Sequence, residues 1–309
     1  MASSPAPTGS LTATVLITTK DRKEDLRTAL TSCMKQTADP EVIVVDDGST
    51  DGTADMVRNE FPSARLHREG TSKGYIAARN LGTKMASGDI VFSIDDDAAF
   101  STPHVVEQTL ADFTRPEIGA VAIPYVDVRI SPDVHQYPPD EESIYCTFSF
   151  RGTAYAVRRK TFLDLGGYRE HLVHQGEEMD LCIRMLDEGR VVRLGTADVI
   201  NHYESPRRSY ERMDFYGRRN DVLFVWHNAP APHHLAWLLL MMVNTARSIA
   251  QYGRAVKFIE GLLRGYVDCF QYWDRRDPVA PTTFKLFHRL RRDGPATLST
   301  VLQQTSVSS

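Results

Sequence analysis

Over the first 123 residues, stretches with the apolar pattern of strands alternate with stretches that have the apolar pattern of helices. Short continuous apolar runs have the length and composition of buried strands, and the stretches between them carry apolar residues at helical spacing. Strands are expected at 12–18, 42–45, 65–67 and 89–94, and helices at 21–33, 54–61 and 75–86. This alternation of strands and helices favours an α/β fold with a mostly parallel sheet covered by helices.

The helix after the first strand has the clearest pattern. Asp21 and Glu24 have the spacing of a capping box, in which two side chains satisfy free backbone amides at the start of a helix. We therefore expect this helix to open at Asp21. Its apolar positions follow i, i+3, i+4, i+7 spacing and are Leu26, Ala29, Leu30 and Cys33.

The pattern changes in the second half of the chain. Residues 124–145 contain four prolines and many acids, which predicts a flexible excursion over a site. Residues 148–158 return to strand character, and residues 179–186 are helical, with Gly189 as a stop signal. From about residue 231 the chain has the pattern of amphipathic helices.

Composition limits the class of protein. The 309 residues are 42% hydrophobic and 25% charged, which is typical of a globular domain. The net charge of −4 argues against a nucleic-acid-binding protein, although residues 205–293 carry 15 Lys/Arg against 8 Asp/Glu. Residues 1–10 are expected to be a disordered tail rather than a signal peptide. We expect one domain over 11–228 and a helical extension over 229–309.

Two features bear on the compartment. The four cysteines are far apart in sequence, which argues against a disulfide framework or a zinc site and favours a reducing environment. The longest apolar run, 235–243, is far shorter than the ~20 residues that a membrane span requires. We therefore expect a cytoplasmic protein, whose membrane contact would be peripheral, at the inner face of the membrane.

Acidic clusters follow the predicted strands. Asp95, Asp96 and Asp97 come directly after an apolar strand, and three adjacent carboxylates repel one another unless a cation neutralises them. Mg²⁺ and Mn²⁺ prefer such oxygen ligands and also bridge phosphates. An isolated acidic triplet is usually a solvated turn. The triplet Asp95–Asp97 instead lies at the carboxyl end of a strand, where α/β sheets bind ligands, and this position favours a metal site.

Other polar positions have similar alternatives. Asp47, in the run VVDDGSTDGT, either forms a turn or contacts a nucleoside. Glu177 and Glu178 open a helix, and His202 follows a short strand, where it is either structural or a metal ligand. Two arginine pairs either hold diphosphate oxygens or lie on a basic surface: Arg207 with Arg208, and Arg218 with Arg219.

Together these motifs resemble the family 2 glycosyltransferases, which have the GT-A fold. The resemblance implies a Rossmann-like sheet, with a nucleotide-binding half at about 11–123 and an acceptor-binding half at about 124–228. The segments that carry it occur in the family's order and are TVLITTKDR, VVDDGSTDGT, KGYIAARNLG, SIDDDAAF, GGYREHLVHQGEEMDLCIRML, NHYESPRRS and GRRND.

The resemblance also implies roles on the donor side. Thr18 and Asp47 match nucleoside contacts, and Arg79 matches an arginine that contacts the base or a phosphate. Asp95 and Asp97 frame the D-x-D motif, in which Asp96 would face the ribose. The metal ligands that the resemblance implies are Asp97, Asp95 and His202.

On the acceptor side, the resemblance implies that Glu178 is the catalytic base. The family's usual Glu-Asp pair is Glu177-Glu178 in this chain, so the sequence leaves open which of the two glutamates acts. Gly166 and Gly167 match a loop beside the acceptor.

The implied enzyme is an inverting glycosyltransferase that requires Mn²⁺ or Mg²⁺. It would move a sugar from a nucleoside-diphosphate donor, UDP or dTDP rather than GDP, to a saccharide, lipid-linked or other hydroxyl acceptor in polysaccharide or glycoconjugate synthesis. The alternatives are a nucleotidyltransferase with a similar sheet and a non-catalytic nucleotide-sugar-binding scaffold. No G-x-G-x-x-G follows the first strand, which disfavours an NAD-dependent dehydrogenase.

The C-terminal extension has three interpretations. Its apolar stripe could pack on the catalytic domain, dock on an anionic membrane surface or form a homo-oligomer interface. Most such stripes pack, so packing is the first expectation. The stripe includes Trp237, Leu238, Met241 and Met242.

Overall fold

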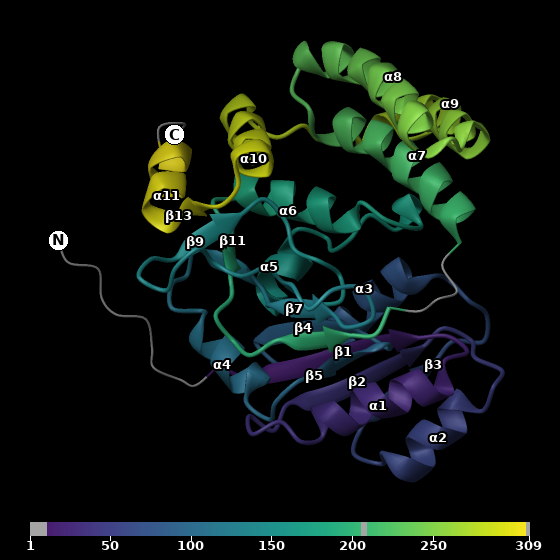
Figure 1. The fold of residues 1–309 in the computed structure, drawn as a ribbon, viewed down its shortest axis with the longest axis vertical. Helices are drawn as coiled ribbons and strands as arrows, with labels where there is room; N and C mark the ends of the chain where they lie inside the picture. The colour runs from purple at the N-terminus through teal and green to yellow at the C-terminus, as the bar shows by residue number, and fades with distance from the viewer. Residues whose placement is uncertain (1–10, 205–208, 307–309) are drawn as a thin grey trace.

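A nine-stranded mixed sheet flanked by helices forms the centre of the protein (Figure 1). The computed structural model describes residues 11–204 and 209–306, so the expected tail at 1–10 and the pair Arg207 and Arg208 lie outside the described residues. The α/β architecture confirms the expected fold class. The strand order is β13-β9-β11-β6-β10-β4-β1-β2-β3, and a second sheet has the order β5-β12-β7-β8.

The strands are β1 (Ala13–Thr19), β2 (Glu41–Asp46), β3 (Arg65–Arg68), β4 (Ile90–Asp95), β5 (Ala98–Phe100), β6 (Ile118–Ala122), β7 (Tyr125–Asp127), β8 (Val134–His135), β9 (Tyr145–Thr147), β10 (Tyr155–Arg158), β11 (Val191–Leu194), β12 (Ile200–His202) and β13 (Ala296–Thr297). The α-helices are α1 (Lys23–Cys33), α2 (Thr53–Glu60), α3 (Tyr75–Met85), α4 (Val105–Ala111), α5 (Arg159–Asp164), α6 (Glu177–Asp187), α7 (Tyr210–Asn228), α8 (His233–Tyr252), α9 (Ala255–Gln271), α10 (Pro281–Asp293) and α11 (Leu298–Ser306). Short 3-10 turns lie at Glu170–Leu172 and Trp273–Arg275.

The N-terminal half contains the parallel strands β3, β2, β1 and β4, as the alternating pattern predicts. The apolar side chains of β1, β2 and β4 are buried on both faces because helices cover both sides, whereas β3, at the edge of the sheet, is partly exposed. Thr18 pairs in register with Val45 of β2 and with Asp95 of β4. The carboxyl ends of these strands therefore meet at one edge of the sheet.

The rest of the large sheet departs from the mostly parallel expectation. β10 runs antiparallel to both β4 and β6, and β9 runs antiparallel to β11, whereas β6 and β11 are parallel. The strand expected over 148–158 is also shorter, because only Tyr155–Arg158 pairs within the sheet as β10. Residues 148–150 carry no strand assignment.

The segment 124–145 was expected to be a flexible excursion, but it contains two strands of the small sheet. β7 pairs parallel with β12, and β12 pairs antiparallel with β5. β5 follows directly after the Asp95–Asp97 turn. The small sheet therefore places Asp127 and His202 beside that turn, since His202 pairs with Ala98 on one side and Asp127 on the other.

The predicted capping box at Asp21 is wrong. Helix α1 begins at Lys23, its N-cap is Arg22, and no side chain caps it through a hydrogen bond. Asp21 instead connects two loops: its amide donates to Ser49 Oγ (2.9 Å), and its carboxylate accepts from the Thr50 amide (2.7 Å). The buried stripe of α1 is as predicted: Leu26, Ala29, Leu30 and Cys33.

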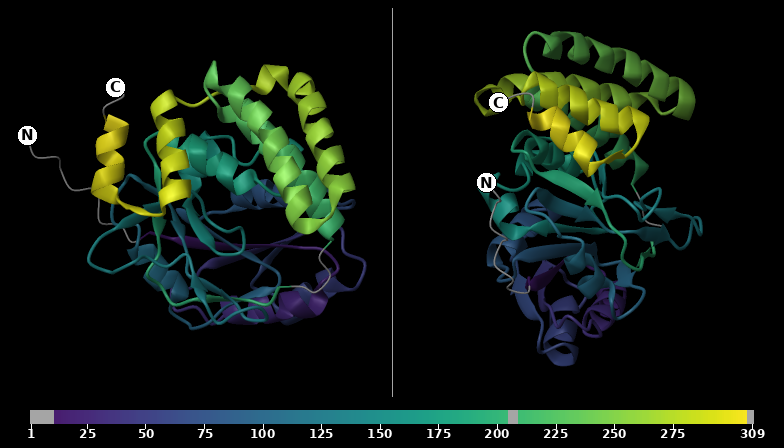
Figure 2. Two further views of the ribbon diagram at one scale, coloured as in Figure 1. Left: turned by 45° about the horizontal axis from the view of Figure 1, so that its top comes forward. Right: turned by 90° about the vertical axis from the view of Figure 1, so that its left-hand side faces the viewer.

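Helices α7, α8 and α9 form a layer above the acidic turn, and α8 and α9 lie on the outside of the molecule (Figures 1 and 2). The extension is not purely helical, because β13 adds to the edge of the large sheet beside β9. Packing is confirmed for part of the stripe: Met241 is buried, and Trp237 and Leu238 pack against the core, whereas Met242 is 54% exposed. No helix in the described ranges is long and apolar enough to cross a membrane.

Candidate active site

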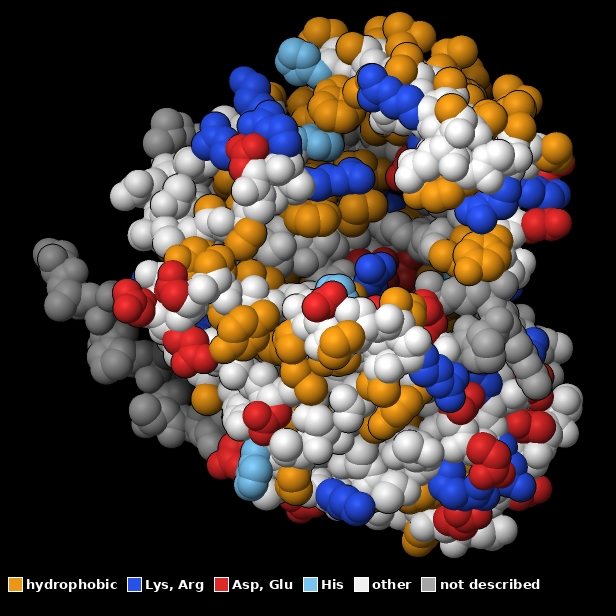
Figure 3. Space-filling model, viewed as in Figure 1, with side chains coloured by type: hydrophobic (Ala, Val, Ile, Leu, Met, Phe, Trp, Pro, Cys, Tyr) orange, Lys and Arg blue, Asp and Glu red, His pale blue; other side chains and the backbone are white. Residues whose placement is uncertain are grey.

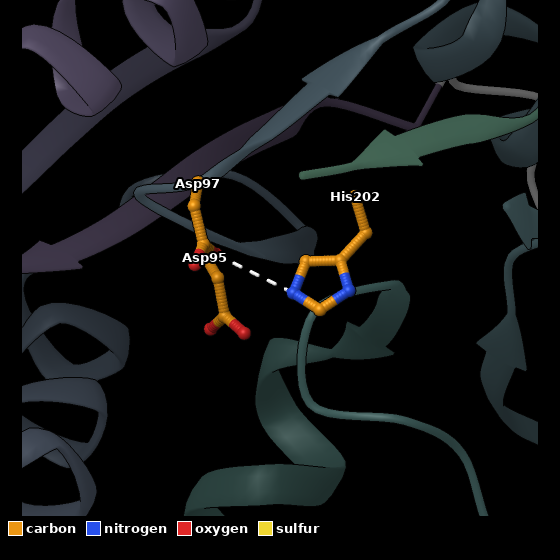
Figure 4. A group of neighbouring side chains, drawn as sticks. All are labelled: Asp95, Asp97 and His202. Atoms are coloured by element: carbon orange, nitrogen blue, oxygen red, sulfur yellow. Dashed lines mark ion pairs between the residues drawn. The ribbon is translucent and has the colours of Figure 1, made fainter. Parts of the chain in front are cut away.

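Two carboxylates and one imidazole meet at the carboxyl edge of the parallel strands. Asp95 is the last residue of β4, Asp97 follows in the turn to β5, and His202 is the last residue of β12. One ligand atom from each of them lies within 4.8 Å of the others, and His202 Nε2 is 3.4 Å from Asp97 Oδ1 (Figure 4). The structure thus brings together the three residues expected to hold a metal.

Asp127 positions the imidazole of His202. Its Oδ1 lies 2.5 Å from His202 Nδ1, so the ring can donate its Nδ1 proton to Asp127, and Nε2 faces Asp97 Oδ1. A carboxylate partner of this kind fixes the tautomer of a metal-binding histidine. Burial opposes protonation of His202, but its hydrogen bonds to Asp97 and Asp127 outweigh burial and raise its pKa. This donor set fits Mn²⁺ or Mg²⁺.

Arg22 and Thr19 stabilise the two buried carboxylates of the turn. Arg22 Nη1 lies 2.9 Å from Asp96 Oδ1 and 2.7 Å from Asp97 Oδ2, and Thr19 Oγ1 donates to Asp96 (2.8 Å). Burial raises the pKa of Asp96 to about 7, against the opposing charge of Arg22. Burial also acts on Asp97, but the His202 hydrogen bond and the charge of Arg22 prevail and lower its pKa to about 2. The two adjacent carboxylates therefore differ in proton affinity.

Arg79 connects the acidic turn to the glutamate pair. It is 4% exposed, its Nη2 lies 2.5 Å from Asp95 Oδ1, and its Nη1 lies 3.5 Å from Glu177 Oε1. Nη2 also donates to the carbonyl of Gly152 (3.2 Å), and the guanidinium lies 4.9 Å from the ring centroid of Tyr75. Residues far apart in sequence therefore line one site.

Glu177 and Glu178 both begin α6, but their side chains have different environments. Glu177 is 1% exposed, faces Arg79, and has one carboxylate oxygen without a hydrogen-bond partner among the described residues. Burial and the neighbouring charge of Glu178 raise the pKa of Glu177 to about 8. Glu178 is only partly buried, and its burial also raises its pKa. Glu178 is therefore the more accessible of the two.

Gly152 leaves space for these side chains. A Cβ atom at this position would lie 2.6 Å from Glu178 Oε1 and 2.9 Å from Arg79 Nη1. The absence of a side chain at position 152 thus lets Glu178 and Arg79 approach each other.

The two expected nucleoside contacts lie at the same edge of the sheet. Thr18 is partly buried near the end of β1. Asp47 is buried, and its carboxylate accepts from Ser72 Oγ (2.5 Å) and from the amides of Lys73 (2.7 Å) and Gly74 (2.9 Å). Asp47 therefore orders the loop that leads into α3, and its contact with a nucleoside remains a prediction.

Neither described arginine of the candidate diphosphate pairs is free to bind phosphate. Arg219 is 5% exposed and forms an ion pair with buried Asp268 (2.5 Å), and Arg218 pairs with Asp221 (3.1 Å). The alternative that Arg219 lies on a basic surface is also wrong, because Arg219 is buried and its ion pair with Asp268 connects α7 to α9. Gly166 and Gly167 both have positive φ, 76° and 71°, which explains the glycines by backbone conformation. Their place beside an acceptor stays a prediction.

Sequence reasoning missed four residues of the site. Arg22, Asp127 and Gly152 lie outside the acidic motifs, and their contacts come from different loops or sheets. The sequence pattern identifies Tyr75 only as the start of a helix, although its ring lies against the guanidinium of Arg79. Of these residues, only Arg22 could have been predicted from the sequence, because it follows the first strand and the end of that strand faces the acidic turn.

A cavity of about 440 Å³ lies next to the glutamate pair, between the start of α6, helix α7 and the turn from α8 to α9. It combines aromatic rings with ion-paired polar groups, and Arg254 contacts Asp214 through two hydrogen bonds. Gln175 and Gly176, which immediately precede Glu177, form one side. The other lining residues include Tyr210, Asp214, Tyr252, Arg254 and Phe258.

Comparison with known proteins gives matches over much of the chain. The sequence model of the family described as glycosyl transferase family 2 matches residues 14–168. An uncharacterized glycosyltransferase of Bacillus subtilis, YwdF, is 30% identical over 197 residues, which cover 60% of this chain and 72% of that protein. The pre-mycofactocin glycosyltransferase of Mycobacterium tuberculosis is 29% identical over 281 residues, or 82% of this chain. The chain spans 56% of that relative's length.

Solved structures share the fold. The mannosyltransferase PcManGT from Pyrobaculum calidifontis, solved in complex with GDP-Man and Mn²⁺, has a TM-score of 0.59 at 19% identity. That match covers 98% of this chain and 88% of the other. S. aureus TarS 1-349 in complex with UDP has a TM-score of 0.58 at 16% identity and covers 96% and 89% of the two chains.

Proposed function

The chain belongs to glycosyl transferase family 2, and from this premise we propose that it moves one sugar, with inversion, from a nucleoside diphosphate to an acceptor hydroxyl. The observation that carries the proposal is the position of Arg79, which contacts Asp95 of the acidic turn and lies 3.5 Å from Glu177 of the acid pair. The turn proposed to bind the metal and the glutamate pair proposed to supply the proton acceptor therefore lie on either side of one arginine. Sugar transfer from a diphosphate to a hydroxyl requires both groups, because a metal stabilises the charged leaving group and a base accepts the hydroxyl proton.

Donor binding is assigned to the edge of the parallel strands. Asp95, Asp97 and His202 would hold Mn²⁺ or Mg²⁺, which neutralises the charge of a departing diphosphate. We assign the nucleoside contacts to Thr18 and Asp47. The resemblance places Asp96 at the ribose and Arg79 at a base or phosphate, but buried contacts already engage both side chains.

We assign the general base to Glu178 rather than Glu177. Glu178 is the more exposed of the two, so an acceptor hydroxyl can approach it. Its raised pKa, caused by burial, makes it a better proton acceptor than an ordinary surface glutamate. Buried Glu177 instead faces Arg79. In a single displacement, Glu178 accepts the hydroxyl proton while the acceptor oxygen attacks the anomeric carbon opposite the diphosphate.

The two halves of the domain then have separate tasks. We propose that residues 11–123 bind the donor and residues 124–228 bind the acceptor. The cavity beside Gln175 and Gly176 is the proposed acceptor side, since exposed aromatic rings such as Tyr210 offer stacking surfaces to a sugar ring. We expect a UDP or dTDP sugar as donor and an acceptor from polysaccharide or glycoconjugate synthesis.

A panel of UDP-, dTDP- and GDP-sugars tests this function, with hydrolysis measured in the presence and absence of Mn²⁺. We expect hydrolysis of a UDP or dTDP sugar that requires the metal, and a transfer product whose anomeric configuration, measured by NMR, is opposite to that of the donor. A product with the donor's configuration would contradict the single displacement. Donor binding without turnover would indicate a scaffold, and pyrophosphate release from a nucleoside triphosphate and a sugar phosphate would indicate a nucleotidyltransferase.

A further inference from the structure

Helices α8 and α9 expose two parallel apolar stripes. On α8, the exposed side chains recur at i, i+4, i+7 and i+8, and on α9 at i, i+3, i+7, i+11 and i+14, so each helix presents a single continuous stripe. Figure 3 shows hydrophobic side chains gathered at the top of the molecule, where Figure 1 places α8. We call these stripes the α8–α9 face: Leu235, Leu239, Met242, Val243, Val256, Ile259, Leu263, Val267 and Phe270.

The exposure of this face is too large to be incidental. Leu239 is 66% exposed, Leu263 60% and Phe270 78%, whereas the opposite sides of the same helices bury Met241 and Leu262. Single exposed apolar residues are common on protein surfaces, but contiguous patches on monomers mark sites of interaction. A contiguous apolar face of this kind is typical of a docking surface.

The charges around the face select its partner. Helix α8 contains no acidic residue, and its Arg247 pairs with no acidic side chain among the described residues. The acids of α9 are neutralised, because Glu260 pairs with Lys257 and buried Asp268 with Arg219 and Arg264. Residues 233–271, which form α8, α9 and the turn between them, carry four Lys/Arg against two Asp/Glu, in a chain whose net charge is −4. The apolar stripes thus lie in a positively charged region.

We infer that the α8–α9 face docks on an anionic membrane surface, with both helices lying in the plane of the lipid headgroups. Apolar stripes bordered by cations, with aromatic residues such as Phe270 and Trp273 exposed at one end, have the chemistry of interfacial helices. Neither helix has the length and apolarity to span a membrane. A symmetric contact between two copies would instead place like charges opposite one another.

Docking would bring the proposed acceptor side to the lipid surface. Tyr252 and Arg254, which lie at the turn between α8 and α9, also line the cavity whose other side is formed by Gln175 and Gly176. The enzyme would thereby reach a hydroxyl carried on a membrane-anchored acceptor. This last step rests on the proposed function, whereas docking itself does not.

Co-sedimentation of the full chain with vesicles tests the inference. We expect binding to phosphatidylcholine vesicles that contain phosphatidylglycerol, weaker binding to phosphatidylcholine alone, and release at high salt. Leu239→Asp and Leu263→Asp should each reduce binding by at least ~10-fold, because an aspartate adds a desolvation cost and a repulsive charge. Met34→Asp replaces an exposed apolar residue directly after α1 and should bind like the wild type.

Two further measurements separate the outcomes. Circular dichroism should show an unchanged fold in all three variants, and metal-dependent donor hydrolysis in solution should stay at the wild-type rate, so a failure to bind vesicles would leave the proposed function intact. The inference is overturned if the wild type stays in the supernatant with anionic vesicles, or if the two leucine variants bind as well as the wild type. A stable dimer that Leu239→Asp dissociates, without vesicle binding, would assign the face to a second copy instead.

Discussion

The guanidinium of Arg79 lies 2.5 Å from the carboxylate of Asp95, at the point where β4 ends. The same side chain approaches Glu177 at the start of α6, so one buried cation stabilises acids from both halves of the domain. The burial of Glu177, which is 1% exposed, is tolerated because Arg79 opposes its charge at close range. The active site therefore depends on Arg79 for its shape as well as its charge.

Replacing Arg79 tests this relationship. Arg79→Met should lower the free energy of unfolding by ~3–5 kcal/mol, because the variant leaves the buried carboxylate of Glu177 without its cation and also removes the partner of Asp95. Urea denaturation measures the change. Arg58→Met removes an ion pair whose arginine is 54% exposed, and it should change stability by less than ~0.5 kcal/mol. Equal stability of the two variants would show that Arg79 does not stabilise the acid groups.

The two glutamates of α6 should respond differently to substitution. Glu178→Gln should fold normally, bind donor and lose ~10²–10⁴-fold in kcat, the range expected for a general base. Glu177→Gln should keep most of its turnover, since Glu177 is 1% exposed, faces Arg79, and is less accessible to an acceptor hydroxyl than Glu178.

Steady-state transfer rates measure both effects. Glu188→Gln provides the matched control, since Glu188 is exposed at the other end of the same helix. Near-normal transfer by Glu178→Gln would remove it as the base, and a larger loss in Glu177→Gln would transfer that role to Glu177.

The hydrogen bond between Asp127 and His202 should control metal affinity. Asp127→Asn leaves the shape of the site but weakens the partner that orients the imidazole, so Mn²⁺ affinity should fall ~10–100-fold. Asp97→Ala removes a proposed ligand and should abolish the metal dependence of donor binding. Calorimetric titration of Mn²⁺ and of donor measures both. Asp133→Asn, at an exposed position in the same segment, should have the Mn²⁺ affinity of the wild type. Equal donor affinity of the wild type with and without Mn²⁺ would refute the metal role.

Gly152 should be required for activity rather than for folding. In Gly152→Ala, the new methyl group would lie 2.6 Å from Glu178 Oε1 and 2.9 Å from Arg79 Nη1, and both are the far ends of flexible side chains that can shift at little cost in stability. We expect a change in unfolding free energy below ~1 kcal/mol with at least a ~10-fold loss in kcat, because the proton acceptor is displaced. Gly70→Ala meets no atom within 4 Å and should leave kcat unchanged. Wild-type kcat in Gly152→Ala would mean that the position of Glu178 is not critical.

A buried histidine pair outside the site should make the fold sensitive to acid. His171 Nε2 lies 3.0 Å from His227 Nε2, and His227 is fully buried. Burial lowers the pKa of His227 to about 4 and that of His171 to about 3. Below pH ~6.5 the unfolded chain therefore binds protons that the folded chain does not, so stability is lost as the pH falls from ~6.5 towards ~4.

Urea denaturation at two pH values measures this loss. Between about pH 7.5 and about pH 5, His227 alone should account for ~2 kcal/mol of unfolding free energy. His227→Gln should have lower stability at neutral pH and a flatter pH dependence. His104→Gln, at an exposed position, should keep the slope of the wild type. An unchanged slope in His227→Gln would show that the pair does not titrate on unfolding.

The local order of residues was enough to predict the alternating strands and helices of 11–123 and the acidic turn after β4. Apolar periodicity determines which face of an element is buried, and this turn follows its strand directly in sequence. The proposed metal ligands Asp95 and Asp97 are therefore accessible to sequence reasoning. The resemblance to a family added His202, which pattern alone left as either structural or functional.

Only the tertiary structure decided the contacts between distant segments. Arg22, Asp127 and Gly152 entered the site because two sheets and a loop meet at one edge, and pairwise distances of that kind depend on packing rather than on neighbouring residues. The same holds for the difference between Glu177 and Glu178, adjacent residues that the orientation of α6 places in different environments. It holds too for the apolar stripe at the C-terminus, because periodicity shows that a helix has an apolar side but not whether another element covers it.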